Sequence, residues 1–369
     1  MNEKRVGSVV GIVATGLMLI SAVTADAAIK SVASQVTSEV HQIANGGGTL
    51  QSDVAQQSLP GQAATPPAIA RARLDQFDPN GSLVGSAQVA TIFTQPIFPL
   101  FLQPPSDIGI DVAGFSNDHR THWTASGAGV ETRKIVMSVS ELSGAYVPGD
   151  IATLRSRVVI SGVMLIASIN SGQDLTGAGV KFQFSVTLRR PGLAETTPVF
   201  GAMTVNGGPN GTITTQGAGI MALQSPAVVD FNGVIPELPQ VKAILFTGIN
   251  FPYEYEIAVE EEFELQLIVG ADIVTRDDGV GCAAIFGTPQ VGLGEIFQRT
   301  RNSDSGVQLQ EAISARVDTT GAAYVQPAAS PTPGICGLLG GNAALLGIAT
   351  LAAFIAAKRR TRSRAGRGD

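Results

Sequence analysis

Short runs in which apolar and polar residues alternate dominate the chain from about residue 83 onward. The clearest run covers residues 180–188. Its apolar positions are Val180, Phe182, Phe184, Val186 and Leu188, and its polar positions are Lys181, Gln183, Ser185 and Thr187. Such alternation is typical of a half-buried strand in an antiparallel sheet. Further β-rich runs lie at residues 89–93, 134–139 and 158–169.

Asn-Gly and Asp-Gly pairs stand between many of these runs. They occupy residues 80–81, 206–207, 210–211, 232–233 and 278–279. Asn, Asp and Gly tolerate the positive φ angles that tight hairpins need. Many strands at this spacing predict a mainly β fold, an antiparallel β-sandwich over residues 83–325, for which a jelly roll is one architecture.

The stretch before the sandwich has a different pattern. Apolar residues recur at intervals of three and four, which is the spacing of one helical face. They are Ile29, Val32, Val36, Val40 and Ile43. We therefore predict one short N-terminal helix, stopped by Gly46-Gly47-Gly48. Residues 45–82 are rich in Gly, Gln, Ala, Pro and Ser and read as a loosely ordered lead-in, so residues 28–82 form a helix plus flexible segment.

Residues 253–269 predict two strands joined by an acidic turn, with the apolar residues on one face of each strand. Clustered carboxylates are also the ligands that Ca²⁺ prefers. The candidate calcium ligands are Glu260, Glu261, Glu262, Asp277 and Asp278. No EF-hand spacing accompanies them, and a solvated acidic edge that discourages strand-to-strand aggregation explains the same residues. We therefore expect no cofactor, with calcium as the alternative.

The C-terminal end combines an apolar run with a basic cluster. Residues 335–357 contain no charged side chain, and about 20 apolar residues span a hydrocarbon core of about 30 Å, so we predict a C-terminal transmembrane or sorting helix there. The basic residues that follow are Lys358, Arg359, Arg360, Arg362 and Arg364. Such residues hold their side of a span in the cytoplasm, so residues 358–369 form a cytoplasmic tail and everything before Pro331 lies outside. A buried core helix would explain the apolar run but not the basic cluster.

The N-terminus agrees with export. Lys4 and Arg5 precede an apolar stretch over residues 6–23, and Ala25-Asp26-Ala27 is a small-x-small cleavage pattern. We predict a signal peptide over residues 1–27, removed by signal peptidase. An uncleaved signal anchor is the alternative, because the apolar stretch is long for a signal peptide.

The two ends together resemble PEP-CTERM-type sorting proteins, which carry a signal peptide and, at the other end, a Pro-containing motif, an apolar span and an Arg cluster. The motif residues in this chain are Pro331, Thr332, Pro333, Gly334 and Cys336, after a Pro-rich linker over residues 326–334. The resemblance covers residues 331–369. It implies an exosortase-like processing enzyme and export by a Gram-negative bacterium that makes extracellular polysaccharide. The chain departs from the family because Thr332 stands between the two prolines instead of Glu, and Cys336 resembles a related class of signals built around a cysteine.

The charge balance restricts the partners. Setting aside the eight basic and three acidic residues of the two ends leaves 16 and 27 of the 24 Lys+Arg and 30 Asp+Glu, a net charge of about −11 for residues 28–357. A body this acidic is a poor partner for nucleic acid or anionic lipid, whose binding depends on Lys and Arg. The composition suits cations or neutral glycans.

Cysteine usage excludes an internal disulfide in the body. Cys282 lies in the body, and Cys336 lies at the start of the apolar run. The body must therefore be held together by its hydrophobic core. We expect Cys282 to be a small buried hydrophobe, the alternative being a reactive thiol.

One cluster in the body contains residue types that can take part in catalysis or ligand binding. It consists of Asp118, His119, His122 and Trp123. The two His residues would share a face on a helix, as zinc ligands do, but point to opposite faces on a strand. Trp123 could stack on a sugar ring. An ordinary strand end with solvated imidazoles is the simplest interpretation.

Signatures of common enzymes are absent from the sequence, which contains no Gly-x-Ser-x-Gly, His-Glu-x-x-His or phosphate-binding loop. We predict a non-catalytic protein exported to the cell surface, with a structural or adhesive role in a surface layer or matrix. The alternative is a module that binds or processes extracellular polysaccharide through Asp118, His119, His122 and Trp123. Convergence of these four residues in a cleft would favour the alternative.

Overall fold

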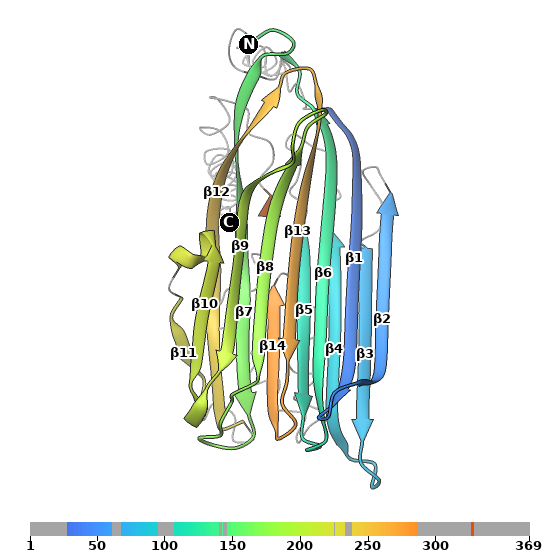
Figure 1. Ribbon diagram of the computed structural model, residues 1–369, viewed down its shortest axis with the longest axis vertical. Helices are drawn as coiled ribbons and strands as arrows, with labels where there is room; N and C mark the ends of the chain where they lie inside the picture. Colours follow the sequence, from blue (N-terminus) through green and yellow to red (C-terminus); the bar gives the residue numbers. More distant parts are fainter. Residues whose placement is uncertain are drawn as a thin grey trace, which may run out of the picture.

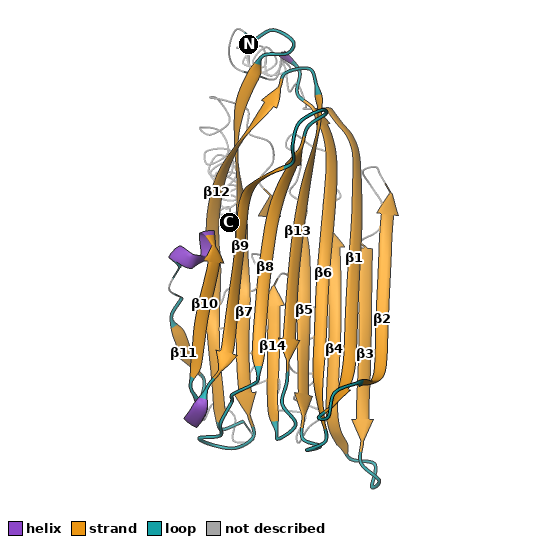
Figure 2. Cartoon of the chain, in the orientation of Figure 1, coloured by secondary structure: helices purple, strands orange, loops and turns teal. Residues whose placement is uncertain are grey.

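The computed structural model describes residues 28–60, 68–94, 107–139, 142, 146–224, 226–232, 238–286 and 326–327. These residues form two antiparallel sheets that pack face to face (Figure 1). Two 3-10 turns, η2 (Pro209–Gly211) and η3 (Ile220–Leu223), are the helical elements among them (Figure 2). The prediction of a mainly β sandwich is confirmed.

The sheet in front in Figure 1, which we call sheet A, has seven strands in the order β10-β9-β8-β13-β6-β1-β2. Their bounds are β1 Ala28–Ala44, β2 Thr49–Pro60, β6 Thr121–Val136, β8 Gly179–Arg189, β9 Thr196–Gly207, β10 Ile213–Gly219 and β13 Glu262–Val274.

Behind it, sheet B has the order β11-β12-β7-β14-β5-β4-β3, and β15 pairs with β7. Its strands are β3 Ala68–Phe77, β4 Leu83–Thr94, β5 Asp107–Ser116, β7 Ile151–Ser168, β11 Val228–Asp230, β12 Gln240–Ala258, β14 Val280–Phe286 and β15 Gln326–Pro327.

The chain crosses between the sheets repeatedly, from β5 to β6, β7 and β8, and again from β12 to β13 and β14. As a result β5, β14, β7 and β12 are neighbours in sheet B, and β6, β13, β8 and β9 are neighbours in sheet A. The β1–β2, β5–β6, β7–β8 and β13–β14 connections gather at the lower end in Figure 1, and the β8–β9 and β12–β13 connections lie at the upper end.

The core fills from the inward faces of both sheets. In β8 the five apolar residues of the alternating run are all buried, as the sequence predicted. Phe182 of β8 stacks on Phe286 of β14, with ring centroids 3.8 Å apart, which joins sheet A to sheet B. Small residues let the sheets approach elsewhere: a Cβ at Gly129 of β6 would lie 2.6 Å from the Ile108 side chain of β5.

The predicted N-terminal helix is wrong, because Ala28–Ala44 is the strand β1. Its inward face repeats with period two, but the polar residues Ser34, Ser38 and Gln42 alternate there with Val36 and Val40. Hydrogen bonds satisfy two of them: the Ser38 hydroxyl donates to the Ala70 carbonyl at 2.9 Å, and Gln42 Nε2 donates to Gln76 Oε1 at 2.7 Å. The apolar positions that remain are four apart, which mimics helical spacing.

The predicted flexible lead-in is also wrong where the structure describes it. Residues 49–60 and 68–77 are the strands β2 and β3, so the sandwich begins at residue 28 and not at residue 83. Both strands lie at sheet edges. Because an edge strand is solvated on more sides, its sequence can be polar and still form a strand.

The two strands predicted around an acidic turn are confirmed as β12 and β13. They belong to different sheets, so the turn crosses the sandwich. Glu260 in this turn has a φ of 66°. Its carboxylate accepts a hydrogen bond from the Val139 amide at 3.0 Å, which anchors the turn at the upper end of β6.

The predicted signal peptide, the apolar run over residues 335–357 and the basic tail lie outside the described residues. Within the described ranges, the structure has no helix of the length and apolar character that crossing a bilayer requires.

Candidate functional site

The four residues predicted as a ligand site do not converge. Asp118 and His119 lie in the β5–β6 loop, and His122 and Trp123 lie at the start of β6. Trp123 points into the core and is 0% exposed, while His122 lies on the opposite face of the strand. A ring with no exposed surface cannot stack on a sugar. The alternative in which Trp123 stacks on a sugar ring is therefore wrong.

The polar members of the cluster tie loops together at the lower end of the sandwich. The Asp118 carboxylate accepts hydrogen bonds from Gln76 Nε2 at 2.7 Å and from Thr121 Oγ1 at 3.0 Å. The His119 amide donates to the Asp277 carbonyl at 2.8 Å. Asn45 Nδ2 donates to the Asp277 carboxylate at 2.6 Å. These bonds join the β1–β2, β5–β6 and β13–β14 loops, which is a structural role.

Hydrogen bonds of its backbone and packing of its side chain fix Trp123 in place. Its amide donates to Thr275 Oγ1 at 2.9 Å, and its carbonyl accepts from the Thr275 amide at 2.9 Å. The indole lies against Gly85 of β4, where an added Cβ would be 2.7 Å from Nε1. Trp123 therefore joins sheet A to sheet B close to the lower end.

The five candidate calcium ligands lie at opposite ends of the molecule. Glu260, Glu261 and Glu262 precede or begin β13, whereas Asp277 and Asp278 follow its end. A 13-residue strand separates the two groups by roughly 40 Å, so they cannot share an ion. In the described part of the chain, no three His, Cys, Asp or Glu side chains form a group that could hold a metal ion.

Cys282 is a buried thiol in β14. Its Sγ donates to the Val274 carbonyl at 3.2 Å. Burial raises the pKa of the Cys282 thiol to about 12. Because the thiolate is the reactive form, the geometry supports the prediction of a small buried hydrophobe.

A groove that the sequence did not reveal lies at the upper end of the sandwich, beside β12. The upper half of β12 pairs with β7 on one side, but β11 pairs with β12 only over Lys242–Ile244. The other side of upper β12 therefore faces the end of β8 and the start of β9 in sheet A. The groove between them has a volume of about 360 Å³. It is lined by Thr153, Leu188, Arg190, Thr196, Thr197, Pro198, Glu254, Tyr255 and Glu256.

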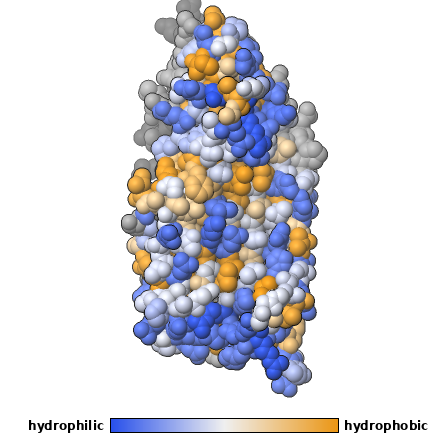
Figure 3. Space-filling view, in the orientation of Figure 1, coloured by the Kyte–Doolittle hydropathy of each residue, from blue (hydrophilic) through white to orange (hydrophobic). Residues whose placement is uncertain are grey.

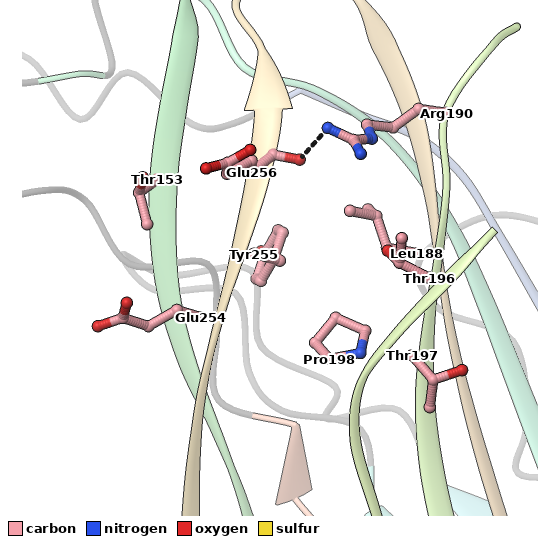
Figure 4. Close-up of a pocket in the computed structure, with 9 residues that line it drawn as sticks. All are labelled: Thr153, Leu188, Arg190, Thr196, Thr197, Pro198, Glu254, Tyr255 and Glu256. Carbon is pink, nitrogen blue, oxygen red and sulfur yellow. Dashed lines mark hydrogen bonds between the residues drawn. The ribbon is translucent and has the colours of Figure 1, made fainter. Parts of the chain in front are cut away.

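The lining combines an apolar centre with polar groups around it. Tyr255, Leu188 and Pro198 lie toward the middle of the groove (Figure 4). Tyr255 is only 4% exposed, so the groove presents little of its ring. Arg190 Nη1 donates to the backbone carbonyl of Glu256 at 3.1 Å, which binds the end of β8 to the open edge of β12.

Donors and acceptors occur on both sides of the groove. Thr153 comes from β7, whereas Thr196 and Thr197 begin β9, and all three are exposed. Arg190 Nε is buried and has no acceptor among the described residues. Hydroxyls both donate and accept, carboxylates accept, and a guanidinium donates in a fixed plane. Together they can hold a ligand that is rich in hydroxyl groups.

The two carboxylates of the groove are placed for binding. Glu254 and Glu256 are two residues apart on one face of β12, opposite the face of Tyr255, and both are exposed.

Sequence reasoning missed this groove for a physical reason. The alternation of Tyr and Glu over residues 253–256 predicts a strand with a solvated acidic face and does not indicate a groove. The residues opposite it, around Arg190 and Pro198, come from a hairpin about 60 residues earlier in the chain. Only the crossing of the chain between the sheets brings the two segments together.

The fold defines the chain as a mainly β protein of two antiparallel sheets. No family model matches it, and no curated protein matches it. One solved structure with some similarity is described as a carbohydrate-binding module of the β-sandwich superfamily. It is 12% identical, with 71% of this chain and 86% of that chain covered and a TM-score of 0.12.

Structures from infectious bursal disease virus are also among the matches. The virus structure of strain Gx is 13% identical over 70% of this chain and 79% of that chain, with a TM-score of 0.09. The VP2 subviral particle is 10% identical over 79% and 73%, also with a TM-score of 0.09. Scores this low do not show a shared fold, and no argument below depends on them.

Proposed function

We propose that this protein is a non-catalytic component of a bacterial surface layer or matrix, and that the groove beside β12 binds a polysaccharide chain. The observation that supports the proposal is the groove. It is open to solvent, it follows the free edge of a strand, and it offers hydroxyl, carboxylate and guanidinium groups around an apolar centre. Sugar polymers present hydroxyls that donate and accept along their length together with apolar ring faces, which suits this mixture.

The sequence supports the proposed location at the cell surface. The N-terminal signal, the apolar run and the basic tail predict an exported chain held or sorted at the surface through its C-terminus. The resemblance of residues 331–369 to PEP-CTERM-type tails implies a bacterium that makes extracellular polysaccharide. A neutral or cationic glycan also suits the acidic body better than an anionic polymer would.

The strand connectivity supports a further assignment, to the jelly-roll class. The eight strands from β5 to β9 and from β12 to β14 follow one another in two sheets, β5-β14-β7-β12 and β6-β13-β8-β9, with crossings at most steps. We infer a jelly roll extended at one side by β1 to β4. Jelly rolls include capsid and lectin domains, so the fold is compatible with assembly and with sugar binding but selects neither.

Binding measurements on the full-length protein in detergent would test the proposal. The probes are soluble neutral, cationic and anionic oligosaccharides titrated by calorimetry. Thr197→Val removes a hydroxyl from the groove, and Glu254→Gln replaces one acceptor oxygen with an amide donor and removes the charge. Since a hydrogen bond contributes about 0.5–1.5 kcal/mol, each variant should weaken binding roughly two- to tenfold.

Glu261→Gln is the matched control, because Glu261 is an exposed carboxylate in the β12–β13 turn outside the groove. Its affinity should equal that of the wild type. If no oligosaccharide binds, or if the control weakens binding as much as the groove variants, the groove is not the ligand site.

A further inference from the structure

The strand β2 closes one whole side of the sandwich. It pairs with β1 and with no other described strand. Its side chains also cover the neighbouring edge of sheet B: Gln57 Oε1 accepts a hydrogen bond from the Ile69 amide, and the Asp53 carboxylate accepts one from the Arg73 amide, both at 2.7 Å. Two backbone amides of β3 are thereby occupied. Among the described strands, β2 and β3 are the edge strands on this side, and β2 lies outermost (Figure 1).

The β2 edge has few of the features that normally prevent pairing with another chain, because its one charged residue, Asp53, faces the neighbouring sheet and accepts the Arg73 amide. Natural edge strands are blunted by Lys, by Pro, by bulges or by shortness. β2 has 12 residues and contains no Lys or Arg, and its Pro60 stands at the very end. Its pairing with β1 is regular from Gln51 to Pro60, without a bulge. Its solvent face carries Leu50 and Val54, each 57% exposed.

The edge strands on the opposite side of the sandwich are less able to pair with another chain. The edge strands there are β10, with seven residues, and β11, with three. β10 contains two glycines and runs directly into the turn η3. Short strands offer few backbone groups to a partner. Among the described edge strands, β2 is therefore the longest that a partner could pair with.

We propose that two copies of this protein assemble through antiparallel pairing of their β2 strands, which joins their A sheets into one continuous sheet. A two-fold axis relates the copies, so the same strand meets itself, as in most soluble dimers. The low charge of β2, in which Asp53 is the one charged side chain, favours a second copy as the partner. The whole chain has a net charge of −6, and two such molecules approach with least repulsion where the surface carries almost no charge.

Charge and hydrophobicity also select the register. With Ser52 on the two-fold axis, Leu50 of each copy lies opposite Val54 of the other, on the same face of the sheet. Asp53 then lies opposite Gln51 of the second copy. A register centred on Asp53 would place two carboxylates directly opposite each other, which is destabilising. The register centred on Ser52 pairs Thr49–Ala55 of the two copies, places the apolar residues opposite each other and avoids this repulsion.

Disulfide trapping in cells that export the full-length protein tests this register. Paired residues in an antiparallel ladder have Cα atoms about 4.5–5.5 Å apart, which is within the range that a disulfide spans. Ser52→Cys should therefore give a covalent dimer on a non-reducing gel. Gln56→Cys is the matched control. Its two copies would lie eight residues apart along the strand, or about 26 Å, and should not cross-link.

Both variants are exposed at the substituted position and retain Cys282 and Cys336, so the background chemistry is the same. Adding Val54→Lys to the Ser52→Cys variant places a charge on each side of the axis. It should reduce the dimer yield at least tenfold while leaving the thermal unfolding of the monomer unchanged.

A covalent dimer from Ser52→Cys with little from Gln56→Cys is the expected result. Failure of Ser52→Cys to cross-link, equal yields from both positions, or insensitivity to Val54→Lys would each overturn the proposal. None of these results depends on polysaccharide binding, so assembly and the groove are tested separately.

Discussion

Substitution of Trp123 tests whether this residue packs in the core or stacks on a sugar ligand. The side chain is 0% exposed, and it lies between the sheets against Gly85. Trp123→Ala removes the bulk of an indole from a packed interior. Large-to-small changes of this kind cost about 3–5 kcal/mol, because the transfer free energy is lost and a cavity remains.

The size of this effect makes it measurable by thermal unfolding. For domains of 150–250 residues, each kcal/mol lowers the Tm by roughly 2–4 °C, so Trp123→Ala should lower it by roughly 10 °C. Trp123→Phe keeps much of the ring and should lower it by less. Gly85→Ala should also destabilise the fold, since its Cβ would lie 2.7 Å from the indole Nε1.

Circular dichroism of the purified protein measures the melting of all three variants, and calorimetric titration with the oligosaccharides measures the affinity of the folded fraction. Trp123 is also the one tryptophan of the chain, so its fluorescence in the wild type should be poorly quenched by iodide. A Trp123→Ala variant that melts like the wild type but has lost sugar binding would refute the assignment of Trp123 to the core.

Three further predictions concern single positions. Gly162→Ala should destabilise the fold by about 1–3 kcal/mol in denaturant titration, because its Cβ would lie 2.3 Å from the Ile285 carbonyl, whereas Gly179→Ala, whose Cβ would meet nothing closer than 3.6 Å, should be tolerated. Cys282 should resist alkylation at pH 8 until the protein unfolds, because burial raises its pKa to about 12; rapid labelling of folded protein would contradict this. Burial also raises the pKa of Asp272 above 3.8. A raised carboxyl pKa favours the folded state at low pH, and this contribution is lost as the pH rises through and above 3.8. Asp272→Asn should therefore match the wild type in acid and unfold at higher denaturant concentration at neutral pH, and equal stability at neutral pH would contradict the sign.

The strands that cross the middle of the sandwich could be predicted, because their inward faces are apolar without interruption. The run from Val180 to Leu188 is such a strand, and so is the run from Tyr253 to Val259. β1 could not be recognised, because Ser38 and Gln42 point inward and are satisfied by partners on β3. A single sequence does not reveal that a buried hydroxyl or amide will find an acceptor far along the chain.

The site was predicted less well for a related reason. A Trp beside two His residues has the composition of a binding surface, and its burial depends on how closely β4 approaches β6. That approach requires the absence of a side chain at Gly85, some 40 residues away in sequence. The groove beside β12 depends in the same way on the short pairing of β11, which leaves the upper edge of β12 open.

Hydrogen exchange of the full-length protein, with and without a bound oligosaccharide, tests the central claim most directly. The account predicts that amide protection on binding concentrates in the β8–β9 connection, residues 189–198, and in upper β12, residues 253–257. Protection in the β5–β6 loop around Asp118 and His119, with no change beside β12, would contradict it.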